Sequence, residues 1–474
     1  MLDDAITIDG TPAAQTAKDE NRHRRDRAGA RRCGRTPRAV LVGLMALAGW
    51  YAGGGVLAGA SDKPTFTVSS TIDGDGKDGV LTLREAILLA NGGTGPSGLA
   101  RPLSLAEKLQ TSGCVLIGSG DSWSIASGCG AGVRDSIAFD LAGCPCTIAP
   151  TTGLPPTTEP VVIDGYSQPG AMPNTDPKAS DAILLVTLDG SDAPSGTSGL
   201  LIAGGTSEVD GLVVANFGGH GIVLTSKDGN RLRGNRIVQA GHDGILVDSS
   251  VNEIGGFAAY RNVIAGCGGH GIEIAYGKVQ NQILRNLIGT ESNAKDLAGN
   301  GGAGISISAS ATTVFGNVIA DNGGSGIDVL AGVRVRIAAN RTFANQGLAI
   351  DLGADGVTPN DRPSRDADDG ANHLQNYPIL TRADHVTGKI RGRLVSTPST
   401  TFTVELFASA SCDPSGHGEA RIYLGSADVA TNANGVARFT IQPSMPFGAG
   451  NAITATATSA DFSTSELSRC RTAK

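Results

Sequence analysis

The middle of the chain carries a short pattern of apolar and polar residues that returns every 21 to 33 residues. Each copy begins with glycine, followed by isoleucine or leucine, a variable residue and a second apolar residue. The copies start at Gly221, Gly244, Gly271, Gly304 and Gly326, with a weaker one at Gly347. Such a period, with several short alternating stretches in each unit, predicts a solenoid of stacked coils.

A second marker repeats in step with the first. Asn235, Asn262 and Asn317 each precede the glycine of their unit by nine residues, and Asn286 precedes its glycine by 18 because of an insertion. We expect three short strands per coil, with the isoleucines stacked as an inward ladder, glycines at the corners and asparagines bonding turn backbone from coil to coil. The predicted fold class is all-β, a right-handed parallel β-helix.

Both ends of this region predict other structures. Residues 65–93 read as a strand and then a short helix that Thr82 caps, with Glu85 closing a capping box, and we expect the helix to cover the end of the strand stack. Residues 94–134 read as an insertion or long loop. Residues after 378 alternate like a β-sandwich, in which the turn Asn432–Gly435 favours a hairpin. The predicted segments are 1–60 targeting, 61–134 cap and insertion, 135–353 parallel β-helix, 354–377 acidic junction loop and 378–474 β-sandwich.

The first sixty residues are typical of an export signal. Eight arginines between positions 22 and 38 precede an apolar stretch from Ala39 to Gly59 that ends in Ala58-Gly59-Ala60. We predict removal after Ala60, which leaves no membrane span and makes the protein secreted or bound to the cell surface. An uncleaved membrane anchor is the alternative.

Seven cysteines remain after that cut, so at least one is unpaired. The pairs that we favour are Cys412 with Cys470 and Cys114 with Cys129. Cys144 and Cys146 are too close in sequence for an easy mutual bridge.

Composition and charge narrow the class of partner. The chain has 68 glycines and 4% aromatic residues, which suits short strands and many turns. Its formal net charge of −7 argues against nucleic acid. We expect a monomer whose partner is a polysaccharide or a cell-surface glycan.

Several segments resemble one known family. Leu81–Ile87, with Ala90 and Asn91 after it, resembles the CSLREA motif of exported bacterial proteins built on the pectin-lyase-like parallel β-helix. Further similar segments are Ile163–Gly170, Asn286–Thr290, Ile350 through Asn376, and Thr401–Glu405 with Cys412–Pro414. The motif's leading cysteine is Leu81 here, so any pairing by that cysteine is absent. The resemblance implies the fold and export, and little about activity.

Candidate chemistry lies beside the glycine-isoleucine strands. His220, Asp243 and His270 stand directly before the glycines, with Glu273, Asp328, Asp248 and Asp351 farther along. If the coils stack in register, Asp243 lies between His220 and His270, and Glu273 lies beside that row. Such a cluster suits acid/base catalysis on a glycosidic or uronate group, and it equally suits a solvated ladder of turn residues.

Two further clusters have alternative interpretations. The loop with Asp361, Asp366, Asp368 and Asp369 offers oxygen ligands for calcium, or it is a hydrated acidic linker. The arginines of the coils are a basic stripe for anionic glycans, or they pair with neighbouring acids; they are Arg233, Arg236, Arg261 and Arg285.

Two functions of different class follow from these observations. The first, which we favour, is a non-catalytic exported scaffold that engages glycans or surface partners. The alternative is a polysaccharide lyase or glycoside hydrolase that acts on an acidic polysaccharide through His220, Asp243, His270 and Glu273.

Overall fold

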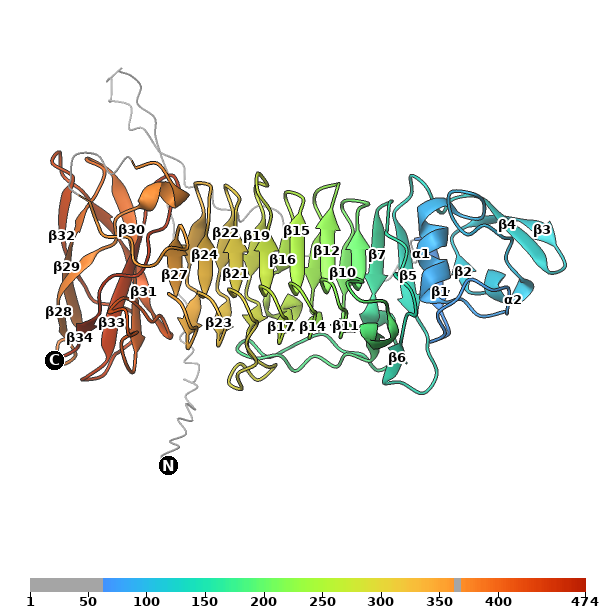
Figure 1. The fold of residues 1–474 in the computed structure, drawn as a ribbon, viewed down its shortest axis with the longest axis horizontal. Coiled ribbons are helices and arrows are strands. Elements are labelled where there is room, and N and C mark those ends of the chain that lie inside the picture. Colours follow the sequence, from blue (N-terminus) through green and yellow to red (C-terminus); the bar gives the residue numbers. More distant parts are fainter. Residues whose placement is uncertain (1–62, 362–367) are drawn as a thin grey trace, which may run out of the picture. The chain divides into compact units, whose positions relative to one another are not determined.

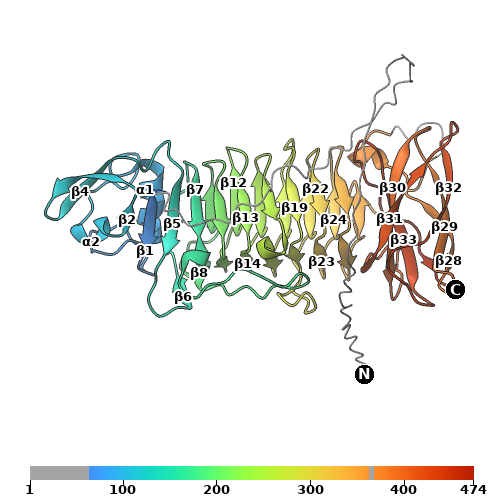
Figure 2. The same cartoon turned by 180° about the vertical axis from the view of Figure 1, so that it is seen from behind.

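The computed structural model describes residues 63–361 and 368–474, and the predicted export signal lies outside them. Most of the described chain winds into coils whose strands form three parallel sheets, seen from two sides in Figures 1 and 2. From Val161 to Leu352, each coil contributes one strand to each sheet. The predicted fold class, a right-handed parallel β-helix with a capping helix and a C-terminal β-sandwich, is therefore confirmed.

The three sheets contain ten, eight and seven strands. Sheet 1 consists of β2 (Thr111–Ser112), β1 (Thr65–Val68), β5 (Asp135–Phe139), β7 (Val161–Asp164), β10 (Glu208–Asp210), β13 (Arg231–Arg233), β16 (Glu253–Gly255), β19 (Gln282–Leu284), β22 (Thr313–Phe315) and β25 (Arg336–Ala338). Sheet 2 consists of β6 (Cys146–Ile148), β8 (Val186–Asp189), β11 (Leu212–Ala215), β14 (Arg236–Val238), β17 (Val263–Ala265), β20 (Leu287–Ile288), β23 (Val318–Ala320) and β26 (Arg341–Phe343). Sheet 3 consists of β9 (Leu200–Ile202), β12 (Ile222–Thr225), β15 (Ile245–Asp248), β18 (Ile272–Ile274), β21 (Ile305–Ile307), β24 (Ile327–Val329) and β27 (Ile350–Leu352).

The interior of the coils is a set of aliphatic ladders. In sheet 3, the isoleucine after each glycine pairs in register with the isoleucine of the next coil, and the ladder from Ile222 to Ile327 is fully buried. Fully burying a side chain of this size contributes about 1.5–3 kcal/mol. A glycine precedes each isoleucine because a Cβ at Gly244, for example, would lie 2.5 Å from a methyl group of Ile264.

Buried asparagines hold the corners together, as the repeat predicts. Asn235, Asn262, Asn286, Asn317 and Asn340 form one ladder, in which each side-chain amide donates to the Oδ1 atom of the next at 2.9–3.2 Å. A second ladder joins Asn230, Asn252 and Asn281, and a third joins Asn300, Asn322 and Asn345. These bonds satisfy buried polar groups that water does not reach.

Helix α1 (Leu83–Gly92) covers the first end of the stack, in contact with β1 and β5. Thr82 and Glu85 form the predicted capping box, and the helix stops at Gly93. The insertion that follows is more ordered than its composition predicts. It contains α2 (Leu105–Lys108), with a capping box from Ser104 and Glu107, and the hairpin of β3 (Val115–Ser119) and β4 (Ser122–Ser127).

The outer face of sheet 2 is partly covered by loops. Val263, Leu287 and Val318 point outward, since the isoleucines that follow them face the core, yet all three are buried together with Ala294 of the loop after β20. The loop before β8 runs along the same coils, where the Ser180 N–H donates to the Ser292 carbonyl at 2.7 Å. Loops therefore cover part of the outer face of sheet 2.

The C-terminal part is a β-sandwich with its own apolar core. One sheet contains β28 (Ile379–Asp384), β29 (Lys389–Val395) and β32 (Val436–Ile441), and the other contains β31 (Ile422–Ala430), β30 (Thr401–Ser409), β33 (Ala452–Thr458) and β34 (Arg471–Thr472). The short 3-10 turns are Gly165–Ser167, Gly190–Asp192, Ala258–Tyr260 and Ala371–Leu374. The positions of the domain boundaries within these residues stay predictions.

The predicted hairpin at Asn432–Gly435 is wrong, although a turn does form there. The strand before it, β31, pairs with β30, whereas the strand after it, β32, pairs with β29 of the opposite sheet. The turn thus joins the two sheets. Alternating patterns give the inward face of each strand, and they do not give its partner.

Two predicted disulfides are confirmed, and one prediction about the cysteines is wrong. Cys114 bridges Cys129, Cys412 bridges Cys470, and Cys267 is free and buried. Cys144 also bridges Cys146, contrary to our prediction. With Pro145 in the turn between them, the Cα atoms are 4.3 Å apart, at the short end of the range that a disulfide spans.

Candidate functional site

The outer face of sheet 3 contains the predicted catalytic residues. Register pairing places one outward residue from each coil in a single row: Val223, Leu246, Glu273, Ser306, Asp328 and Asp351. The row changes from apolar to polar at Glu273. Successive members are separated by one coil, roughly 4.8 Å.

A second row lies where the chain enters each strand of sheet 3. The Gly221 N–H donates to the Asp243 carbonyl, and the Gly244 N–H donates to the His270 carbonyl. Asp243 therefore lies between His220 and His270 on successive coils, in the order that the repeat predicts.

The four predicted side chains are brought together around Asp243. Its Oδ2 atom lies 3.1 Å from Nδ1 of His220, and its Oδ1 atom accepts the backbone N–H of His270 at 2.7 Å. Glu273 shares a side-chain hydrogen bond with the same carboxyl group. Asp243 is 5% exposed, so this is a nearly buried centre rather than a loose surface group.

The two carboxyl groups are shifted in opposite directions. Burial raises the pKa of Glu273, and its hydrogen bond to Asp243 and the charge of Asp243 raise it further. Burial also acts to raise the pKa of Asp243, but hydrogen bonds from His220, the His270 backbone and Glu273 outweigh it, so this pKa is lowered. Glu273 is thus the proton donor of the pair, and Asp243 is the carboxylate.

Neighbouring groups set which nitrogen of each histidine is available to a ligand. The Ala303 N–H donates to Nδ1 of His270 at 2.9 Å, so this ring, when neutral, carries its proton on Nε2 and offers a hydrogen-bond donor there. Nδ1 of His220 instead lies closest to the Asp243 carboxylate, at 3.1 Å, and donates to it, which leaves the lone pair on Nε2. The lone pair that a general base needs is therefore engaged in His270 and not in His220.

Two neighbouring acids extend the row beyond the predicted four. Asp328 and Asp351 are paired in register on adjacent coils, and burial raises the pKa of both. Asp351 is 6% exposed, and within the described chain the Oδ1 atoms of both residues have no hydrogen-bond partner.

Sequence reasoning missed His242. Its ring centroid lies 5.3 Å from that of His220, so it adds a third imidazole to the cluster. The available signal was its position in the repeat, where Gly219 and Gly269 occupy the corresponding place in the neighbouring coils.

The predicted calcium loop is only partly described, because Asp366 lies outside the described residues. Oδ1 of Asp361 accepts a hydrogen bond from the side-chain amide of Asn376 at 2.7 Å. Among residues 63–361 and 368–474, which include Asp368 and Asp369, no group of three or more His, Cys, Asp or Glu side chains is placed to hold a metal ion. Calcium at Asp361, Asp366, Asp368 and Asp369 stays a prediction.

The arginines of the coils do not form a single stripe. Arg233 in β13 contacts Glu208 at 2.6 Å and Glu253 at 3.1 Å on sheet 1, whereas Arg236 in β14 contacts Glu291 at 2.9 Å on sheet 2. Arg233 and Arg236 thus lie on different sheets, and each is paired with glutamate side chains. For these two arginines the structure fits the second interpretation, pairing with neighbouring acids.

The chain is similar to one family over part of its length. The family model described as periplasmic copper-binding protein (NosD) matches residues 186–353, which is the coil region from β8 to β27. A periplasmic family agrees with the predicted export. The described residues do not offer a set of ligands for a metal ion, so we derive no step through copper. The CSLREA resemblance has no counterpart in this match.

Several solved structures are similar to parts of the chain at low identity. They include the alginate lyase from Paenibacillus sp. str. FPU-7, at 20% identity over 45% of this chain and 70% of that one, with a TM-score of 0.32. The A-module of a mannuronan C-5 epimerase from Azotobacter vinelandii is 15% identical over 46% and 72%, with a TM-score of 0.30. The enzymatically active domain of tailspike protein 2 of bacteriophage CBA120 is 9% identical over 76% and 79%, with a TM-score of 0.26. Identities and TM-scores this low do not support an inference about the activity of this chain.

No curated protein sequence matches the chain. In the described part of the chain, no helix is long and apolar enough to cross a membrane.

Proposed function

We propose that the protein is exported and acts as a non-catalytic scaffold that binds glycans along the outer face of sheet 3. The observation that carries this proposal is the fixed state of His270 beside the carboxyl groups. His270 presents an Nε2–H donor, because the Ala303 N–H occupies its Nδ1 atom, whereas His220 donates to Asp243 from Nδ1 and presents an Nε2 acceptor. Beside them, Asp243, Glu273 and Asp328 supply acceptors and one shared proton.

The rigidity of the face supports binding of a long polymer. The polar row lies on strands whose inward neighbours are fully buried isoleucines, so its members do not have to be ordered when a ligand arrives. Hydrogen-bond donors and acceptors that recur once per coil suit the hydroxyl groups of successive sugars in a polysaccharide. The C-terminal sandwich acts in this proposal as an anchoring or adhesive module.

The charge of the face favours some glycans over others. The charged groups that shift the pKa values of Glu273 and Asp328 are Asp243 and the histidines, and none of these groups is a lysine or an arginine. A uronate polymer at neutral pH meets like charge there, whereas neutral or amino sugars do not. We therefore expect neutral or amino glycans to bind more tightly than uronates at pH 7.

One observation favours the enzyme alternative, a polysaccharide lyase or glycoside hydrolase. In the pair of Asp243 and Glu273, the pKa of Glu273 is raised and that of Asp243 is lowered, so Glu273 is the better proton donor for a leaving oxygen. The two carboxyl groups share a hydrogen bond and therefore lie closer together than the acid and the nucleophile or base of a glycosidase. The engaged Nδ1 atom argues against His270 as general base, whereas His220 keeps a lone pair on Nε2.

A binding and turnover experiment tests both functions. The full chain and a His270→Ala, Glu273→Ala variant are measured against neutral, amino-sugar and uronate polymers for binding, reducing ends and the absorbance of unsaturated ends. We expect binding without product, and binding about tenfold or more weaker in the variant, since each charge-assisted hydrogen bond contributes about 1.5–3 kcal/mol. Asp248→Asn, on the same sheet but paired with Lys278, is the control. Product that disappears in the variant would establish the enzyme, and failure to bind any glycan would refute the scaffold.

A further inference from the structure

A cavity at the edge of the C-terminal sandwich belongs to neither proposed function. Its volume is about 600 Å³, within the range of pockets that hold small ligands. The walls come from three separate segments. Asn360 belongs to the segment after the last coil, Tyr377 to Leu380 lead into β28, and Arg469 to Arg471 lead into β34.

Two arginines on one wall have no counter-ion among the residues that the structure describes. Arg469 and Arg471 are both exposed, and no described carboxylate lies within 4.0 Å of either guanidinium. They are two residues apart in an extended segment, so both side chains leave the same side of it. Their separation along the strand is roughly 6.5 Å.

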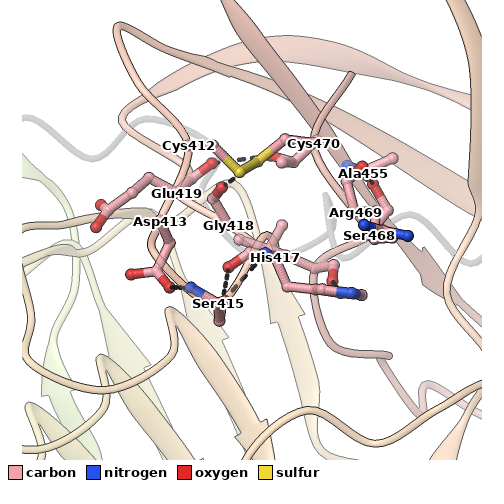
Figure 3. Close-up of a disulfide and its surroundings, with 12 residues drawn as sticks. Cys412, Asp413, Ser415, His417, Gly418, Glu419, Ala455, Ser468, Arg469 and Cys470 are labelled. Atoms are coloured by element: carbon pink, nitrogen blue, oxygen red, sulfur yellow. Dashed lines mark hydrogen bonds between the residues drawn. A yellow bond between two sulfur atoms is a disulfide. The ribbon is translucent and has the colours of Figure 1, made fainter. Parts of the chain in front are cut away.

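A disulfide fixes this wall. Cys470 stands between the two arginines and is bridged to Cys412 (Figure 3). Its backbone N–H donates to the Gly416 carbonyl at 3.0 Å. Arg469 is paired through its backbone with His417. The two guanidinium groups therefore extend from an anchored backbone, which reduces the ordering cost of binding.

The opposite wall is apolar and aromatic, and it is also held in place. Asn360 bonds the backbone of Tyr377 twice, donating from Nδ2 to its carbonyl at 2.8 Å and accepting its N–H at 2.9 Å. The Tyr377 ring packs edge to face with His417 at 5.1 Å between centroids. Burial raises the pKa of Tyr377, so its hydroxyl stays protonated and offers a donor at neutral pH.

We propose that this cavity binds a small anionic saccharide, one sugar or a short oligosaccharide that carries a carboxylate. The two free guanidinium groups select an anion, and arginine matches the planar carboxylate with two parallel hydrogen bonds. The apolar wall with Tyr377 and Leu380 covers the body of a sugar ring, which inorganic anions lack. This site is independent of the glycan-binding face on sheet 3.

Binding of trigalacturonate to the full chain tests the proposal by calorimetry at low and at moderate salt. Neutral trigalactose and inorganic phosphate are the comparison ligands. We expect trigalacturonate to bind most tightly and to weaken with salt. Arg469→Gln and Arg471→Gln each weaken binding about ten- to a hundredfold, and the double variant abolishes it.

Matched variants separate recognition from folding. Arg231→Gln removes the same charge from an exposed position in β13, and binding stays unchanged. Arg469→Lys retains part of the affinity, because the charge remains without the planar pair of donors. The proposal is overturned if the double variant binds like the native chain at an unchanged melting temperature, if trigalactose binds equally well, or if phosphate binds as tightly as trigalacturonate.

Discussion

Asp135 provides the sharpest test of the energetics of the fold. It begins β5 on the side that faces the core, in line with Ile137 and Phe139, and it is fully buried. Its Oδ2 atom accepts the Gly130 N–H at 2.7 Å, whereas Oδ1 has no hydrogen-bond partner among the described residues. Burial raises the pKa of this carboxyl to about 7.

The sign and size of the effect on stability follow from that pKa. The unfolded chain releases the proton near pH 3.9, and the folded chain keeps it to about pH 7. Between these values the folded state binds more protons, so the free energy of unfolding falls as the pH rises. At 1.36 kcal/mol per pH unit the whole loss is about 4 kcal/mol, complete above pH 7 and absent below pH 4.

The substitution Asp135→Asn removes this titration while it keeps the shape of the side chain. The amide oxygen accepts the Gly130 N–H, and the NH₂ group takes the place of the protonated Oδ1. We expect the variant to gain up to about 4 kcal/mol over the native chain at pH 8 and almost nothing at pH 4. Urea unfolding of both proteins from pH 4 to pH 8 measures the difference.

The comparison of the two proteins isolates Asp135 from the other buried acids. Burial also raises the pKa of Glu419 and of Glu466 to about 7, and their contributions cancel in the difference between variant and native chain. Asp135→Ala is the control, since it removes the same titration but leaves the Gly130 N–H without an acceptor, so it should be less stable than Asp135→Asn at every pH. A difference between Asp135→Asn and the native chain that is the same at pH 4 and pH 8 would refute the reasoning.

Two further predictions concern the coils and the acidic loop. Asn286→Ala should cost about 3 kcal/mol or more in urea unfolding, because it leaves Asn262, Asn317 and the Ile254 carbonyl without their buried hydrogen bonds, whereas Asn434→Ala in an exposed turn should change little. If calcium binds at Asp361, Asp366, Asp368 and Asp369, millimolar calcium should raise the melting temperature and EDTA should reverse the rise; a melting temperature that follows neither removes the calcium prediction.

The coils could be predicted from the sequence because one coil constrains the next. Once the glycine before Ile245 marks a corner, the register of Ile222, Ile245 and Ile272 follows, and with it the order of His220, Asp243 and His270. The sandwich lacks such a repeat. Its strands were visible as alternating residues, but the pairing of β31 with β30 and of β32 with β29 depends on contacts between distant segments.

The chemical state of the site depended on atoms that no residue pattern reveals. The tautomer of His270 follows from the backbone N–H of Ala303, 33 residues away on the next coil. That same bond turns His270 from a candidate base into a hydrogen-bond donor. Likewise, Arg469 and Arg471 stand in an unremarkable stretch of sequence, and only the segment around Tyr377 makes them one wall of a cavity.

The two proposed sites separate by charge, and this separation makes them testable in one protein. Carboxyl groups line sheet 3, whereas free guanidinium groups line the cavity of the sandwich. A uronate ligand is therefore expected to bind the cavity and to avoid the coils at neutral pH, and a neutral polymer is expected to do the opposite. Lowering the pH protonates Glu273 and Asp328, whose pKa values are raised, before it affects the arginines. Uronate binding to sheet 3 should therefore appear on acidification even in a chain that lacks Arg469 and Arg471.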